Sequence, residues 1–246
     1  MTACAVLSVL LGASSVWAID NQDRDQISRS FSLPTKARVE VSAISGSVDI
    51  QAVDGETAIV QIERTARSRA ELDCNKVVLR QVFGNLFIKS EMVCENIVVQ
   101  VRHRVLLSVP RTVDLSVQGV SGPVNIGEID GALRIIGNSG KINLAQSRSG
   151  SLILGNSGTT SINLRQLDAR RLRLIGNSGV IKLNIPDEVN VDVRVSRISG
   201  SVSSELPNVK FNKIGAADYH ARIGSGGPMI DVSGGSGSVV LSRYPE

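Results

Sequence analysis

The sequence predicts an all-β protein, namely a β-solenoid with coils of about 18–21 residues and a longer-stranded β cap at its N-terminal end. An internal repeat is the first observation: LRIIGNSGKINL (133–144) recurs as SLILGNSGTTSINL (151–164) and as LRLIGNSGVIKLNI (172–185). Regular spacing is the second, because the Ser-Gly pairs end at residues 122, 140, 158, 179 and 200. Composition is the third. Only 3% of the residues are aromatic, as suits thin coils filled by Val, Ile and Leu.

Residues 1–18, MTACAVLSVLLGASSVWA, form a short apolar run without charged side chains. Val16 and Ala18 occupy the small-residue positions of a cleavage site, so this segment is predicted to be a signal peptide. The protein is then exported and is periplasmic, secreted or on the cell surface. A buried N-terminal strand is the alternative. The run is too short to span a bilayer, and no transmembrane segment is expected elsewhere.

Residues 19–115 are predicted to form the N-terminal β region that caps the coils. Alternating apolar and polar residues indicate strands over 31–66 and 77–109, with a turn at Gly84-Asn85. Residues 67–76 alone have helical character. No linker rich in Pro, Gly or Ser separates this region from residues 116–246, so both are expected to form one continuous domain.

Two of the three cysteines are expected to form a disulfide. Cleavage of the signal peptide removes Cys4 and leaves the even pair Cys74 and Cys94 in an oxidising compartment. The bond would close a loop of about 20 residues and contribute about 3 kcal/mol. Two buried free thiols are the alternative.

Residues 116–246 are predicted to form the coils, each with short strands around a Gly-Asn-Ser-Gly corner. Four-residue strands cannot bury an apolar face alone, whereas stacked coils can, although each corner could locally be a hairpin turn. Asn138, Asn156 and Asn177 would stack as a corner ladder with amide-to-amide hydrogen bonds. Residues 207–220 interrupt the repeat as an insertion, and residues after it are expected to add a last coil or two.

The formal net charge of +4 lies on the repeat half of the chain. Arg134, Arg171 and Arg173 are predicted to share one outer face that binds an anionic envelope polymer or headgroup. A solvated face without a ligand is the alternative. Nucleic acid is not an expected partner, because the charge is modest and few aromatic residues accompany it.

The sequence offers no catalytic, metal or cofactor site. His103 stands between Arg102 and Arg104, where a surface or strand-pairing position is expected. His220 could pair with Asp218 or with a serine. The Gly-Asn-Ser-Gly corners lack the helix that a nucleophile elbow requires, and the glycines at 224–227 open no helix for phosphate binding.

Two segments resemble a known family. VLLSVPRTVDLSVQGVSGPVNIGEIDG (105–131) and IGSGGPMIDVSGGSGSVVL (223–241) are similar to the bacterial putative-adhesin domain, a β-strand-repeat family of unknown function. The resemblance covers roughly residues 35–243 and implies an exported, noncatalytic β-solenoid. It transfers no functional residues, because the family has no established active site.

These observations lead to three functional hypotheses. The first is a noncatalytic adhesin or cell-envelope interaction or scaffold protein, whose partner is an anionic envelope polymer or a surface protein. The second is an enzyme that acts on a polysaccharide, which needs clustered Lys/Arg and Asp on one face. The third is self-association through the ends of the solenoid.

Overall fold

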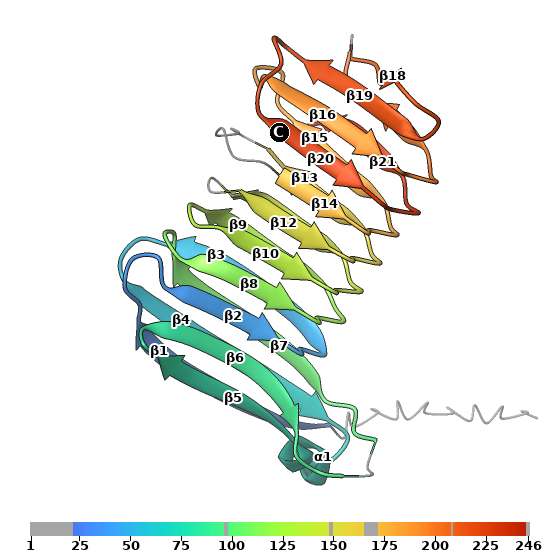
Figure 1. Cartoon of the computed structure of the whole chain (residues 1–246). Coiled ribbons are helices and arrows are strands. Elements are labelled where there is room, and N and C mark those ends of the chain that lie inside the picture. The colour runs from blue at the N-terminus through green and yellow to red at the C-terminus, as the bar shows by residue number, and fades with distance from the viewer. Residues whose placement is uncertain (1–21, 96–97, 148–149, 165–171, 208, 245–246) are drawn as a thin grey trace, which may run out of the picture.

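The computed structural model of the protein describes residues 22–95, 98–147, 150–164, 172–207 and 209–244. The predicted signal peptide (1–18) and Arg171 lie outside these residues. Within them the fold is all-β, as predicted, with one short helix. Two sheets face each other along the length of an elongated body (Figure 1).

The first sheet has ten strands. In spatial order these are β1 (Asp23–Ser32), β4 (Thr57–Ala66), β7 (Arg102–Pro110), β3 (Gly46–Val53), β9 (Val124–Ile129), β11 (Ile142–Ser147), β13 (Thr160–Asn163), β15 (Ile181–Ile185), β21 (Val239–Arg243) and β17 (Val202–Ser204).

The second sheet has eleven strands. In spatial order these are β18 (Asn212–Lys213), β19 (Asp218–Ile223), β16 (Val191–Ser196), β20 (Met229–Ser233), β14 (Leu172–Ile175), β12 (Ser151–Leu154), β10 (Leu133–Ile136), β8 (Asp114–Gln118), β2 (Arg38–Ser42), β6 (Asn85–Met92) and β5 (Asn75–Val82). The single helix, α1 (Arg69–Cys74), lies beside β4 and β5.

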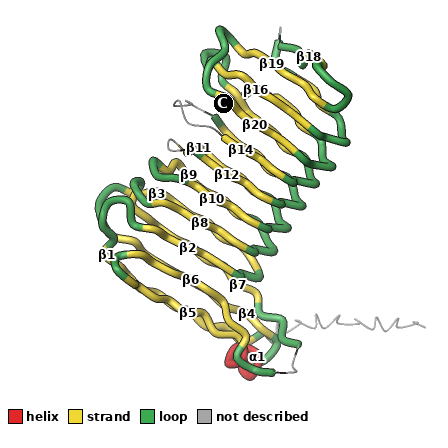
Figure 2. The backbone as a smooth tube through the Cα atoms, viewed as in Figure 1, coloured by secondary structure: helices red, strands yellow, loops and turns green. Residues whose placement is uncertain are grey.

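Consecutive strands of the repeat alternate between the two sheets, so each pair forms one rung of the stack (Figure 2). Leu133 of β10 pairs in parallel with Leu115 of β8 and with Ser151 of β12. Neighbouring rungs therefore follow the 18-residue interval of the repeat, and the pairing of Ser151 with Leu172 follows the 21-residue interval. The inner faces of both sheets are filled by buried Val, Ile and Leu.

The order of the rungs differs from the sequence order at both ends. The expected last coil, β20–β21, lies between β14–β15 and β16–β17 rather than after them. At the other end β6–β7 stacks below β2–β3, which precedes it in the chain. In each case an antiparallel strand covers the outer edge: β19 pairs with β16, and β5 pairs with β6. The outermost strands are therefore β1 and β17 in the first sheet and β18 and β5 in the second.

Each Gly-Asn-Ser-Gly corner contains two glycines with different roles. The first has a left-handed backbone, with φ of 62° at Gly137, and Ala43 and Arg197 adopt the same conformation at the equivalent corners of other rungs. The last glycine lies against the preceding rung. A Cβ added to Gly140 would lie 1.9 Å from the carbonyl oxygen of Gly122, and Gly158 and Gly179 repeat this approach.

Asn138, Asn156 and Asn177 stack at the second corner position and are at most 2% exposed. Their hydrogen bonds differ from the predicted amide-to-amide pattern. Asn138 Oδ1 accepts from the backbone N–H of Val120 (2.8 Å), and Asn177 Oδ1 accepts from that of Asn156 (2.9 Å). These amides therefore satisfy buried backbone donors of the neighbouring rung, which bends away from strand pairing at the corner.

Amide-to-amide bonds do occur on the outer face of the first sheet, where the sequence analysis placed no ladder. Asn143 Nδ2 donates to Asn125 Oδ1, and Asn184 Nδ2 donates to Asn163 Oδ1, each at 2.6 Å. The alternation of apolar and polar residues along this strand could have predicted these bonds, because Asn143 faces away from its buried neighbours Ile142 and Leu144.

The N-terminal region contains the predicted helix and the Cys74–Cys94 disulfide. Beside the helix, buried Arg64 donates through Nε to Asp25 Oδ1 (2.8 Å) and through Nη1 to the carbonyl oxygen of Leu72 (3.0 Å). The turn between β5 and β6 consists of Phe83 and Gly84, one residue earlier than predicted.

His103 is buried with 1% exposure, so its expected surface position is wrong, although it does pair with Gly46 and Arg64 in the sheet. It is in phase with the inward-facing Val105 and Leu107, a periodicity that identifies it as a core residue. Nδ1 lies 3.2 Å from the carbonyl oxygen of Ser45, and Nε2 lies 3.1 Å from Asn75 Oδ1.

Burial lowers the pKa of His103 below its ordinary value of 6.5, and Arg64 lowers it further, against the opposing effects of the Ser45 carbonyl and Asp25. The unfolded chain therefore binds a proton first as the pH falls. We expect the contribution of neutral His103 to the free energy of unfolding to be complete above pH 6.5 and to be lost as the pH falls toward the folded-state pKa.

Urea unfolding at about pH 7.5 and about pH 5.5 measures this effect. His103→Gln keeps a polar side chain but does not titrate, so its loss of stability between the two pH values should be smaller than that of the wild type. An equal loss in both proteins would assign the pH dependence to other groups.

Candidate functional site

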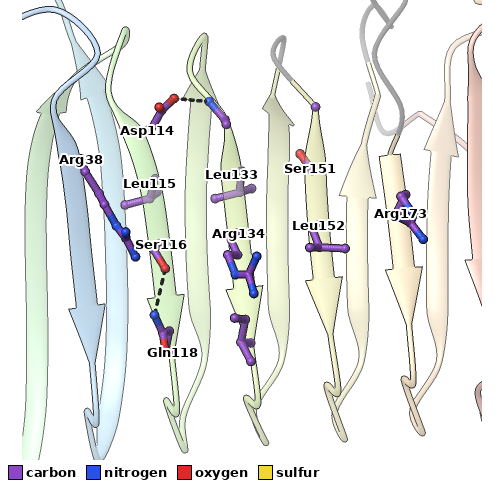
Figure 3. A pocket seen from close by; sticks show the side chains of 13 residues that line it. Arg38, Asp114, Leu115, Ser116, Gln118, Leu133, Arg134, Ser151, Leu152 and Arg173 are labelled. Atoms are coloured by element: carbon purple, nitrogen blue, oxygen red, sulfur yellow. Dashed lines mark hydrogen bonds between the residues drawn. The ribbon is translucent and has the colours of Figure 1, made fainter.

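The outer face of the second sheet contains a groove of about 750 Å³ across β2, β8, β10, β12 and β14. Arg38, Arg134 and Arg173 line it, and all three are exposed (Figure 3). The groove is open, because its floor is the outer face of a sheet, where polar and apolar side chains such as Ser116, Gln118 and Leu152 line it. It is suited to an extended ligand that lies across the strands rather than to an enclosed small molecule.

Arg134 and Arg173 face the same way because the strands between them are in register. Arg134 pairs with Leu152 of β12, and Leu152 pairs with Arg173 of β14. Two strand spacings place their backbones about 9.6 Å apart. The half-buried Leu152 lies between them. The structure thus brings together two of the three predicted face residues, whereas Arg171 lies outside the described residues.

Neither Arg134 nor Arg173 forms an ion pair or hydrogen bond with another described residue. Both side chains are exposed, so among the described residues nothing neutralises these two guanidinium groups. Guanidinium groups bind carboxylates and phosphates through paired N–H donors. The face can accordingly hold anionic groups at two points along the stack.

Arg38 joins this face from the N-terminal region, which the sequence analysis did not anticipate. It is brought there by the parallel pairing of β2 with β8, where Arg38 lies opposite Asp114. Its Nη2 donates to Glu40 Oε2 at 2.9 Å, so its charge is partly neutralised. Asp114 Oδ1 in turn accepts from the backbone N–H of Ala132 (2.8 Å; Figure 3).

The row of paired residues that contains Arg134, Leu152 and Arg173 continues beyond the groove. Arg173 pairs with Asp231 of β20, and Asp231 pairs with Arg194 of β16. An acidic residue therefore separates Arg173 from the next cation. The positive section of the row ends at Arg173.

A second polar cluster lies where β19 pairs with β16. Asp192 Oδ1 accepts from Arg222 Nε (3.0 Å) and lies 3.2 Å from His220 Nε2, while Oδ2 accepts from the Gly227 N–H (3.0 Å). The hydrogen bond from Arg222 holds the pKa of Asp192 below its ordinary value, assisted by the Gly227 N–H. His220 thus contacts Asp192 rather than Asp218 or a serine, the pairings that the sequence left possible, because β19 pairs with β16 and places His220 opposite Arg194, two residues from Asp192.

Within the described ranges, no group of three or more His, Cys, Asp or Glu residues could hold a metal ion. The same ranges contain no helix that is long and apolar enough to cross a membrane. Neither histidine is hydrogen-bonded to a described serine hydroxyl.

Comparison with solved structures finds matches of low identity that cover most of this chain. A "putative cell adhesion protein" from Clostridium sporogenes has 8% identity and a TM-score of 0.46, over 90% of this chain and 100% of that chain. A "putative adhesin" from Bacteroides fragilis has 13% identity and a TM-score of 0.46, over 88% of this chain and 97% of that chain. No protein with a curated description matches this sequence.

The family comparison covers nearly the whole chain. The family model described as Toastrack DUF4097 matches residues 21–242. This match confirms the resemblance that the sequence showed to a β-strand-repeat family of unknown function. The chain belongs to the Toastrack DUF4097 family.

Proposed function

We propose that this chain is a noncatalytic, exported β-solenoid that binds an anionic polymer of the cell envelope, as an adhesin or an envelope scaffold. The observation that carries the proposal is the exposed pair Arg134 and Arg173, which share one face and have no described partner. Their spacing along the stack suits a linear polyanion that lies across several strands.

The solenoid interpretation rests on the pairing of the rungs. Parallel strands at 18- and 21-residue intervals, joined by corners of the same four residues, are typical of stacked coils. Such a stack presents a long, rigid face, and this rigidity reduces the entropic cost of holding an extended ligand. Export would place that face among envelope polymers, and the Cys74–Cys94 disulfide is compatible with an oxidising compartment.

We expect Arg134→Ala/Arg173→Ala to weaken binding to purified anionic envelope polymers about 30-fold, at about 1 kcal/mol for each cation. Isothermal titration at two salt concentrations measures this effect, and higher salt should weaken wild-type binding more than binding of the variant. Lys182→Ala/Arg243→Ala is the control, because it removes two exposed cations from the opposite sheet. Equal affinities of the wild type and the arginine variant would refute the proposed face.

An enzyme acting on an acidic polysaccharide is the second candidate, because Asp114 lines the groove and lies opposite Arg38 in register. An acidic side chain next to cations is the arrangement that this hypothesis requires. Incubation with acidic glycans, followed by an assay for new chain ends, tests it. New ends that disappear with Asp114→Asn would favour the enzyme, whereas binding without cleavage would favour the noncatalytic proposal.

A further inference from the structure

The tip of the β5–β6 hairpin carries an apolar side chain that the fold does not use. Phe83 is 98% exposed, and the adjacent Val82 is 43% exposed. The hairpin lies at the edge of the second sheet, and its tip is at the opposite end of β5 and β6 from α1 (Figure 1). The ring therefore projects into solvent from one end of the molecule.

The backbone at the tip favours a different residue. Val82 pairs with Asn85, so Phe83 and Gly84 form a two-residue turn, and both have positive φ (49° and 78°). Hairpin turns that require positive φ at both positions favour Asn-Gly, and a bulky side chain there is strained. Phe83 thus has two costs: its backbone is strained at positive φ, and its apolar ring is exposed to water. Contact with something outside the chain would offset both costs.

Two cations without described partners, Lys36 and Arg80, lie close to the tip along the chain. The turn lies against Pro34, since a Cβ added to Gly84 would lie 2.9 Å from Pro34 Cγ, and the exposed Lys36 follows two residues later. Arg80 is exposed and shares the Val82 side of β5 by alternation. Neither Lys36 nor Arg80 forms an ion pair with a described residue.

We propose that this tip, formed by Lys36, Arg80, Val82, Phe83 and Gly84, docks on an anionic lipid surface. Phe83 and Val82 would enter the boundary between headgroups and acyl chains, and Lys36 and Arg80 would contact anionic headgroups. Two apolar side chains cover much less than the surface of about 800 Å² that each partner buries in a standard protein interface. A lipid surface accepts a tip of this size because it has no fixed shape to match.

Co-sedimentation of the full chain with phosphatidylcholine vesicles, with and without phosphatidylglycerol, tests the proposal. Phe83→Asn should weaken binding to the anionic vesicles about tenfold, since the apolar transfer of one ring is lost. The same variant should have an equal or higher Tm, because Asn-Gly suits the turn. A lower affinity together with a higher Tm would separate docking from a structural role.

Two controls complete the test. Val98→Asn replaces another side chain with 90% exposure and should leave vesicle binding unchanged. Lys36→Ala/Arg80→Ala should reduce the preference for phosphatidylglycerol. Wild-type binding by Phe83→Asn, or no binding of the wild type to either vesicle, would overturn the proposal. Arg134→Ala/Arg173→Ala should still bind vesicles, so the groove and the tip can fail independently.

Discussion

Gly140→Ala is expected to destabilise the protein by about 3 kcal/mol or more, the upper range for overpacking, and to prevent soluble expression if the remaining stability is small. The added methyl would lie 1.9 Å from the carbonyl oxygen of Gly122 and 2.2 Å from its carbonyl carbon. Both atoms are backbone, so no side chain can rotate away. The neighbouring rungs would have to separate at the corner, and the stack would lose parallel pairing around it.

Gly137→Ala in the same corner is the matched control. No atom lies within 4 Å of a Cβ added there, so its cost is that of an alanine at φ 62°, about 1 kcal/mol. Ala43 already tolerates this conformation at an equivalent corner. Urea unfolding of both variants measures the difference, and equal destabilisation would contradict the distinction between the two glycines.

Loss of the Cys74–Cys94 disulfide should lower the free energy of unfolding by about 3 kcal/mol, because the closed loop restricts the unfolded chain. The bond links the end of α1 to the segment after β6. Its removal should loosen the N-terminal end while the middle rungs remain paired. Thermal unfolding of Cys74→Ala/Cys94→Ala, compared with the wild type with and without reductant, measures this loss.

Reductant should lower the Tm of the wild type toward that of the double variant and should not change the Tm of the variant. A wild-type Tm that does not respond to reductant, with the bond shown to be broken, would mean that the disulfide contributes little to stability.

The middle rungs could be predicted from the sequence because the pattern that specifies them lies within each short strand and its corner. Apolar residues alternate along each short strand, and the corner residues recur at fixed intervals, as the pairing of Leu133 with Leu115 and Ser151 shows. The order of the end rungs could not be predicted in this way. It depends on the antiparallel pairing of β19 with β16, in which Asp192 is opposite Arg222, and no repeat encodes that pairing.

The candidate site was also predictable only where it lies within the repeat. Arg134 and Arg173 follow from their equivalent positions in the repeat, whereas Arg38 reaches the groove only because β2 stacks on β8. His103 could have been placed in the core by its phase with Val105. Phe83 gave no periodic signal, because its importance comes from exposure and from φ, and both are properties of the folded chain.

Side-chain NMR of the arginines during titration with an anionic envelope polymer tests the proposed face most directly. We expect the Nε–Hε signals of Arg134 and Arg173 to shift together and saturate, while that of Arg243 on the opposite sheet stays unchanged. Shifts at Arg243 without shifts at Arg134 and Arg173, or saturable binding without any shift at those two residues, would contradict the proposed face.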